Sequence, residues 1–169
     1  MPTGDVKTTF VATATITMSL ASIATSATFV AGAESASQAN SSLYTDARLT
    51  GKITVGTTPT INTQIRLYVF AAMDDTPTWP DVMDGTDSVE TLTSVGVGEG
   101  FLKLAAIINV DAVTSNVAYN FTSVPFSELF GNVPKNWGVF LAHNTGVNLH
   151  ATGGNHLVKV DYWHYNVSP

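Results

Sequence analysis

Apolar and polar residues alternate along much of the chain, with the period of two that is typical of half-buried β-strands. In residues 61–71, Ile65, Leu67 and Val69 share one face of the predicted strand, and Gln64 and Arg66 lie on the other. Similar runs predict strands near residues 10–20, 27–33, 43–55, 101–110, 119–124, 137–143, 147–151 and 156–167. No stretch has the sustained helical period that a fold of alternating strands and helices needs.

Turn-forming residues separate these runs. Gly56–Thr60 has the length of a hairpin connection between the two strands that flank it. Asn144–Gly146 and Thr152–Asn155 have similar turn chemistry near the C-terminus. Phe126–Phe130 predicts a single helical turn that Gly131 ends.

Together these elements predict an all-β fold: an antiparallel two-sheet β-sandwich, jelly-roll-like, with a flexible N-terminal arm. The length of 169 residues suits one sandwich domain, which we place at residues 10–169. Residues 1–9 contain Pro2 and Gly4 and form the arm, which we expect a partner to order. Residues 74–100 are the longest irregular stretch, a length that is usually functional or partly disordered.

The N-terminal region resembles a targeting segment at first sight. The chain carries no charge between Lys7 and Glu34, and Ala31–Ala33 has the small residues of a signal-peptidase site. However, Thr or Ser stands at every second position from Thr13 to Ser19, which interrupts any apolar core. Neither a secretory signal nor a membrane helix fits this pattern, so we interpret the segment as a strand.

Composition narrows the choice of partners. Only 12% of the residues are charged, whereas Thr and Ser make up 37 of the 169 residues. The net charge of −6 and the absence of a basic cluster argue against nucleic acid as a partner. The chain has no cysteine, which excludes disulfides, thiolate metal sites and a cysteine nucleophile.

The residues that often carry catalysis or bind metals form no recognisable motif. The four histidines (His143, His150, His156 and His164) are six to eight residues apart, and zinc sites usually have closer spacings. The acidic segment 81–90 lacks the EF-hand pattern, although a looser calcium loop stays open. There is no Gly-x-Ser-x-Gly elbow, and Gly96–Gly100 precedes a strand without the Lys of a phosphate loop. We therefore expect no enzymatic activity, no cofactor and no bound metal.

Aromatic residues and the arm supply the candidate contact residues. We expect Trp137 in the core and Trp163 at least partly exposed, because Trp163 shares a strand face with Lys159 and Asp161, opposite the more apolar face of Val158, Val160 and Tyr162. Trp79 lies between prolines in the long loop and is the best candidate for a contact with a partner. The predicted partner-binding residues are those of the arm and this loop: Pro2, Thr3, Val6, Lys7, Trp79 and Pro80.

Two longer motifs resemble segments of small tailed-bacteriophage virion proteins. The first is Leu49–Thr60, which runs into Gln64–Phe70. The second is Phe130–Gly146, with its Pro-x-x-Trp-Gly strand and Asn-Thr-Gly turn, followed by the aromatic strand Val160–Tyr165. With Phe29–Ser35, the resemblance extends over most of the chain.

This resemblance implies a capsid decoration (cement) protein or another small structural component of the virion. It implies no catalytic residues, and it suggests a jelly-roll-like fold that binds the major capsid protein or other virion proteins as a homo-oligomer. We would then expect the protein in the virion, after assembly in the host bacterial cytoplasm. The alternative is a glycan-binding tail-spike or adhesin module that uses Trp79 and the acidic loop. A hydrolase is a third possibility, and it would need a carboxylate pair that the sequence does not place.

Overall fold

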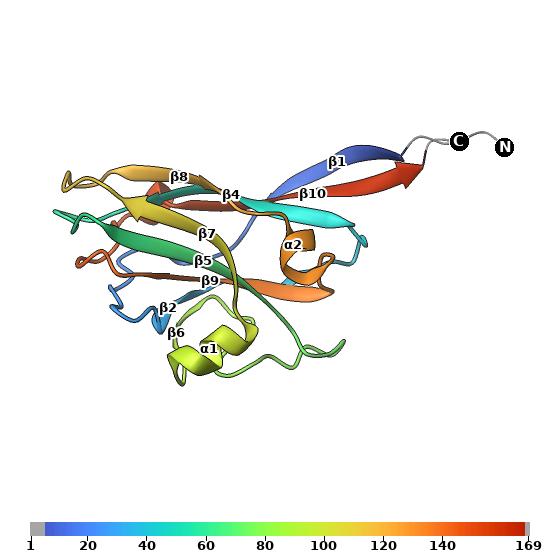
Figure 1. The fold of residues 1–169 in the computed structure, drawn as a ribbon, viewed down its shortest axis with the longest axis horizontal. Coiled ribbons are helices and arrows are strands. Elements are labelled where there is room, and N and C mark those ends of the chain that lie inside the picture. Colours follow the sequence, from blue (N-terminus) through green and yellow to red (C-terminus); the bar gives the residue numbers. More distant parts are fainter. Residues whose placement is uncertain (1–5, 168–169) are drawn as a thin grey trace.

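The computed structural model describes residues 6–167 (Figure 1). In chain order the elements are β1 (Val6–Thr15), β2 (Ala31–Glu34), β3 (Gln38–Ala39), β4 (Asp46–Thr54), β5 (Thr63–Ala71), β6 (Ser88–Thr91), α1 (Val95–Phe101), β7 (Lys103–Val110), β8 (Ala118–Thr122), α2 (Phe126–Phe130), β9 (Asn136–His143), a 3-10 turn (Gly153–Asn155) and β10 (Leu157–Val167). No helix in this part of the chain has the length and apolar character needed to cross a bilayer.

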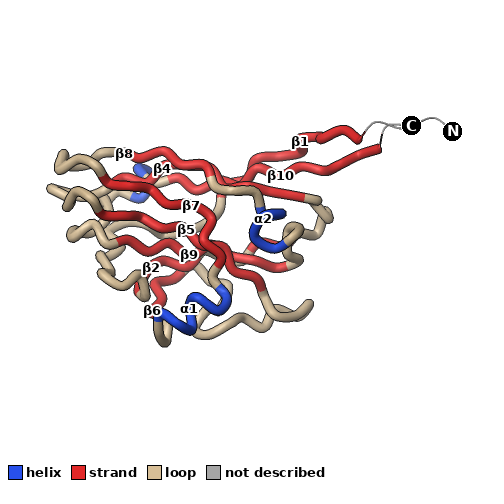
Figure 2. Tube along the Cα trace, viewed as in Figure 1, coloured by secondary structure: helices blue, strands red, loops and turns tan. Residues whose placement is uncertain are grey.

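The strands form two antiparallel sheets, which confirms the predicted all-β sandwich. The first sheet has the order β1-β10-β4-β8, and the second has the order β6-β2-β9-β5-β7, with β3 beside β9 (Figure 2). The main pairings are nested along the chain: β1 with β10, β2 with β9, β4 with β8, and β5 with β7. A long hairpin rolled into two sheets in this way is the jelly-roll arrangement.

The main core lies between the two sheets. Its largest fully buried members include Leu49, Ile53, Ile65, Leu67 and Trp137. The alternation predicted for residues 61–71 is therefore confirmed, because the apolar positions of β5 point into this core. Tyr162 and Val160 of β10 close the core from the opposite sheet.

A second, smaller cluster lies where residues 72–102 meet the second sheet. Phe70 and Phe140 are fully buried there against Met83, Leu92 and Leu102. The sequence predicted residues 74–100 as one irregular stretch, but β6 and nearly all of α1 lie within it. Ser94 caps α1 by accepting a hydrogen bond from the Val97 N–H at 3.2 Å. Burial of the apolar side chains orders this segment. Its glycines, which are unfavourable in helices, kept α1 from being predicted from the sequence.

The hairpin predicted at Gly56–Thr60 is wrong. β4 pairs with β10 and β8, whereas β5 pairs with β7 and β9 in the other sheet. The connection therefore crosses between the sheets, and the Thr60 N–H donates to the Thr145 carbonyl at 2.8 Å. This crossing lets Ile53 and Ile65 face the same core from opposite sides, which a flat hairpin would prevent.

Three other predicted boundaries shift, and one element is confirmed. The strand predicted at 147–151 is reduced to one bridge between Val55 and Leu149. The N-terminal strand ends at Thr15, although Ile16 is still buried. Residues 6–9 belong to β1 and not to a flexible arm, because they pair with β10; residues 1–5 lie outside the described residues. The predicted turn of helix is confirmed as α2, which ends at Gly131 with φ 83°.

Candidate interaction site: the ribbon of β1 and β10

A two-stranded ribbon extends from one end of the sandwich (Figure 1). The pairing of β10 with β4 ends at Trp163, opposite Asp46, whereas its pairing with β1 continues to Val167, opposite Val6. We call this extension, residues 6–10 of β1 and 163–167 of β10, the ribbon. Two strands alone are marginally stable in water, and a third strand or a packed face is normally needed. We therefore expect the ribbon to gain stability when a partner adds a strand to it or packs against its face.

Contacts at the base of the ribbon attach it to the sandwich. The Thr45 N–H donates to the Trp163 carbonyl at 3.1 Å, and the Tyr165 N–H donates to Thr45 Oγ1 at 2.9 Å. On the inner face, the ring of Tyr44 stacks on Tyr162 with ring centroids 4.3 Å apart. Tyr44 also contacts His164, with centroids 5.1 Å apart. These contacts give the ribbon a fixed direction where it leaves the body.

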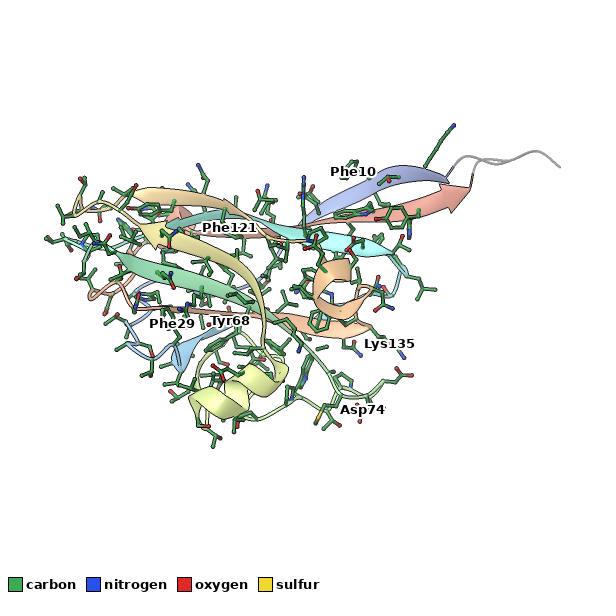
Figure 3. The ribbon with its side chains drawn as sticks, viewed as in Figure 1. Phe10, Phe29, Tyr68, Asp74, Phe121 and Lys135 are labelled. Carbon is green, nitrogen blue, oxygen red and sulfur yellow. The ribbon has the colours of Figure 1, made fainter. Side chains whose placement is uncertain are left out.

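The outer face of the ribbon carries exposed aromatic surface. Phe10 is 69% exposed and Tyr165 is 50% exposed, and Figure 3 shows Phe10 beside β1 at the upper surface of the molecule. The Phe10 ring lies against Trp163, with centroids 5.9 Å apart. Trp163 is 8% exposed, so the prediction that it is partly exposed is wrong. It shares the outer face with Tyr165, but Phe10 packs beside it from the neighbouring strand.

A β-bulge interrupts β1 beside this aromatic pair. Phe10 is opposite Trp163 and Ala12 is opposite Tyr162, so Val11 is the extra residue. A shallow depression of about 390 Å³ lies next to the bulge, lined by Phe10, Val11, Thr13, Arg48 and Asp161. In it, Thr13 Oγ1 donates to Asp161 Oδ1 at 2.7 Å, and Arg48 Nε lies 3.5 Å from Asp161 Oδ2. Both charged groups of the depression are thus already paired.

A larger and more apolar cavity opens at the same end of the sandwich. It measures about 550 Å³ and is lined by residues that include Leu43, Tyr44, Val133 and Lys135. Leu43 is 79% exposed at its rim. Apolar exposed residues therefore gather at the end from which the ribbon extends, as surfaces that bind other proteins often do.

The predicted partner-binding residues do not all come together. Lys7 is exposed on β1, Val6 begins that strand, and Pro2 and Thr3 lie outside the described residues. Trp79 is half-buried with its ring edge-on to Phe70, centroids 5.5 Å apart, and Pro80 is buried. Trp79 thus packs against the second cluster, and neither it nor Pro80 belongs to the ribbon.

Three acidic residues of the long loop accept hydrogen bonds from threonines of the same loop. Asp81 accepts hydrogen bonds from the N–H and the hydroxyl of Thr93, and Asp74 does the same for Thr78. Asp84 accepts from the Thr86 hydroxyl and N–H, which lowers its carboxyl pKa below the usual value. Among residues 6–167, no three His, Asp or Glu side chains converge in a way that would hold a metal ion.

Glu34 is a buried carboxyl that connects β2 to this loop. Burial raises its pKa to about 7, against the opposing effect of the Gly85 N–H at 2.7 Å and the Asp84 N–H at 3.3 Å. The histidines have structural partners too: His143 contacts Thr145 Oγ1 at 3.0 Å, and burial lowers its pKa. Burial likewise lowers the pKa of His156, whose Nδ1 accepts from the Thr54 N–H at 3.3 Å.

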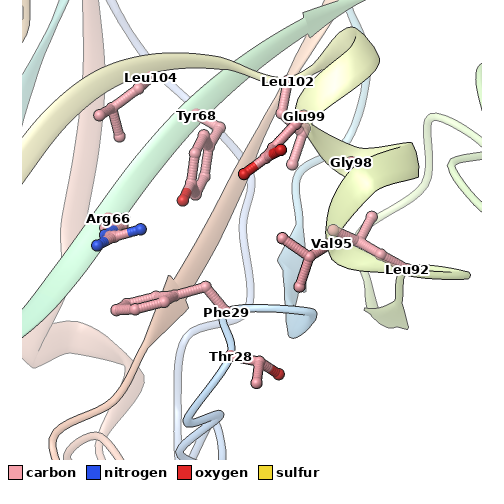
Figure 4. Close-up of a pocket in the computed structure, with 10 residues that line it drawn as sticks. All are labelled: Thr28, Phe29, Arg66, Tyr68, Leu92, Val95, Gly98, Glu99, Leu102 and Leu104. Carbon is pink, nitrogen blue, oxygen red and sulfur yellow. The ribbon is translucent and has the colours of Figure 1, made fainter.

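A separate cavity of about 270 Å³ lies between β5, β7 and α1 (Figure 4). The guanidinium of Arg66 lies 3.9 Å from the ring centroid of Phe29, and Gln64 Oε1 accepts from its Nε and Nη2 at 2.9 and 2.8 Å. Tyr68 and Glu99 also line this cavity, as do the apolar residues Val95 and Leu92, and Figure 4 shows the Glu99 carboxyl between Tyr68 and Val95. Sequence reasoning missed this site, because its residues come from segments far apart in the chain.

The ribbon was also only half predicted. The sequence suggested the N-terminal residues as contacts, but not Phe10 or Tyr165 of the C-terminal strand. One signal was available: Phe10 and Val11 are two successive large apolar residues within a polar alternation, which is typical of a bulge. In comparisons with known proteins, no family model, no curated protein and no solved structure matches this chain.

Proposed function

We propose that this chain is a non-enzymatic structural protein of a virion, of the capsid decoration (cement) type, and that it docks on the shell through the ribbon. The observation that carries the proposal is the ribbon itself: two strands that leave the sandwich with Phe10 and Tyr165 exposed, and no third strand from residues 6–167 pairs with their outer half. Exposed aromatic residues are common anchors at protein interfaces.

Two further features support this proposal. The motifs at Leu49–Thr60 and Phe130–Gly146 resemble segments of small tailed-phage virion proteins. The chain is also rich in Thr and Ser and poor in charge, and burying a hydroxyl against another protein costs less than burying Lys or Glu. The partners would be the major capsid protein or other virion proteins, and the protein would join the particle in the host bacterial cytoplasm.

Co-sedimentation with shells tests the proposal. Shells that lack this protein are mixed with the purified wild-type chain, with a variant without residues 1–9, and with the variant Tyr165→Ser. The matched control is Val113→Ser, because Val113 is 58% exposed in the loop between β7 and β8, at the end of the sandwich opposite the ribbon (Figure 1). We expect the control to sediment like wild type and both ribbon variants to sediment less. Undiminished binding of both ribbon variants would contradict a docking role for the ribbon.

The second candidate function is glycan binding, and the cavity beside Arg66 is the observation that favours it. Its guanidinium, aromatic rings and carboxyl are groups that sugar sites use for hydrogen bonding and stacking. A glycan array probed with wild type and with Arg66→Gln, each with and without calcium, separates the two functions. Arg48→Gln is the matched control. Reproducible binding that only Arg66→Gln abolishes would favour an adhesin over a decoration protein.

A further inference from the structure

Strand β1 is the edge of the first sheet, and backbone hydrogen bonds of its neighbour β10 show which way its N–H and C=O groups point. The Ile16 N–H donates to the Val158 carbonyl, whereas the Trp163 carbonyl accepts from Thr45 on the β4 side. Because backbone groups alternate along a strand, the even-numbered residues of β10 face β1. Their partners on β1 also face β10, and these are residues 7, 9, 12, 14 and 16.

The remaining residues of β1 turn their N–H and C=O groups toward the open edge. On one side of the bulge they are Thr8 and Phe10, and on the other side they are Thr13 and Thr15. The bulge at Val11 thus switches the open positions from even to odd numbers. Lys7 is the one charged residue in the ten residues of this strand, and charged residues are what edge strands usually carry to prevent pairing with another chain.

This switch makes β1 complementary to itself. In an antiparallel pair of identical strands, residues opposite each other must both face the partner strand or both face away. With a two-fold axis between Phe10 and Val11, Thr8 lies opposite Thr13 of the second copy, and Lys7 lies opposite Ala14. The first pair faces inward to the new ladder and the second faces away, as the rule requires. Opposite residues also share a face of the sheet, because the bulge shifts the side-chain alternation together with the backbone.

We propose that two copies of this chain associate through β1, antiparallel and about a two-fold axis between Phe10 and Val11, into one continuous sheet across the dimer. Phe10 of one copy then lies beside Val11 of the other, next to the depression lined by Thr13 and Arg48. The two Lys7 side chains are separated along the strands by about 24 Å, at 3.4 Å per residue. Two-fold dimers are the commonest closed assembly of identical chains.

The dimer goes beyond the proposed function, because the isolated chain is expected to form it in solution without a shell. Sedimentation equilibrium over a wide range of concentrations is expected to give a dimer for wild type. Val11→Lys is expected to give a monomer, because it places two charges next to the axis. Val89→Lys is the matched control, since Val89 is 66% exposed on β6, the edge strand of the other sheet. A monomeric wild type, or a dimer that survives Val11→Lys, would overturn the proposal.

The register is tested by disulfide trapping, which the cysteine-free chain makes unambiguous. A mixture of Thr8→Cys and Thr13→Cys is expected to form a covalent dimer under mild oxidation, because cross-strand neighbours lie within disulfide range. A mixture of Thr8→Cys and Thr15→Cys, displaced by two residues, is expected to cross-link far less. Circular dichroism confirms that each variant folds. Equal cross-linking in both mixtures would overturn the proposed register, and a failure of shell binding would leave the dimer intact.

Discussion

Strands β9 and β1 are similar in length but differ in nearly every other respect. All residues of β9 after Asn136 are buried, with β2 or β3 on one side and β5 on the other. β1 has a neighbour on one side, and both Phe10 and Val11 are exposed. Packing inside the molecule accounts for each residue of β9. It leaves Val11 exposed, and it leaves Phe10 exposed apart from the contact with Trp163. The proposed contacts of β1 with other chains would explain this difference.

The comparison predicts the largest loss of stability in β9. The ring of Trp137 is fully buried, with centroids 4.8 Å from Phe126 and 6.5 Å from Tyr162. We expect Trp137→Ala to lower the free energy of unfolding by about 3–5 kcal/mol, measured by urea denaturation. Trp137→Phe should cost less than half as much, because Trp137 Nε1 has no hydrogen-bond partner to lose. Equal losses in the two variants would contradict this explanation.

Glu34, at the end of β2, makes stability depend on pH. Its folded-state pKa of about 7 exceeds the ordinary value of 4.5, so the folded protein holds a proton that the unfolded chain releases. The free energy of unfolding should therefore fall as the pH rises from 4.5 through 7, by up to about 3 kcal/mol. Glu34→Gln should flatten this dependence in urea denaturation, and Glu99→Gln, at an exposed position, should not. An unchanged pH profile for Glu34→Gln would be the contrary result.

Asp46, the first residue of β4, lies beside the ribbon and links the sheet to α2. Its carboxylate accepts from the Ser127 N–H at 2.9 Å and from the Ser127 hydroxyl at 2.6 Å, at the N-terminus of a helix whose own cap position, Pro125, makes no side-chain hydrogen bond. Asp46→Ala should lower the free energy of unfolding by about 1–2 kcal/mol. Asp75→Ala should change it little, because the ion pair of Asp75 with Lys135 is exposed. Thermal denaturation compares the two, and equal losses would rule out the capping role.

The smallest effect on folding is expected in the ribbon. Phe10 is 69% exposed and contacts Trp163 through one side of its ring. Phe10→Ala should lower the free energy of unfolding by less than about 1 kcal/mol, whereas it should weaken association with partners much more. Urea denaturation and sedimentation of the same variant measure both quantities. A loss of stability comparable with that of Trp137→Ala would place Phe10 in the structural core after all.

Sequence periodicity predicted what depends on local pattern. The strand at 61–71, the turn of helix at Phe126 and the burial of Trp137 all follow from alternation or turn chemistry near each residue. The crossing at Gly56–Thr60 was missed, because which sheet a strand joins depends on distant partners such as β10. The burial of Trp163 under Phe10 was missed for the same reason, since 153 positions separate the two residues (163 − 10).

The candidate site was predicted only in part, again because pairing between distant segments decides which residues are exposed. Lys7 and Val6 were expected as contacts because the N-terminal residues read as an arm, but the strand that carries them is paired with β10. The open edge of β1 is a backbone property and has no residue signature apart from the scarcity of charge. Trp79 read as a contact residue because prolines flank it, but Phe70 and Gly85 surround its ring in the fold.

The most direct test of this account is a reconstruction of purified virions by electron cryomicroscopy. If the protein docks as proposed, the jelly-roll sandwich lies on the outside of the capsid shell, with the ribbon of β1 and β10 turned toward its partners and Phe10 and Tyr165 in the contact. Density for the chain in the tail, or on the shell with the ribbon pointing freely into solvent, would contradict the claim that the ribbon is the docking element.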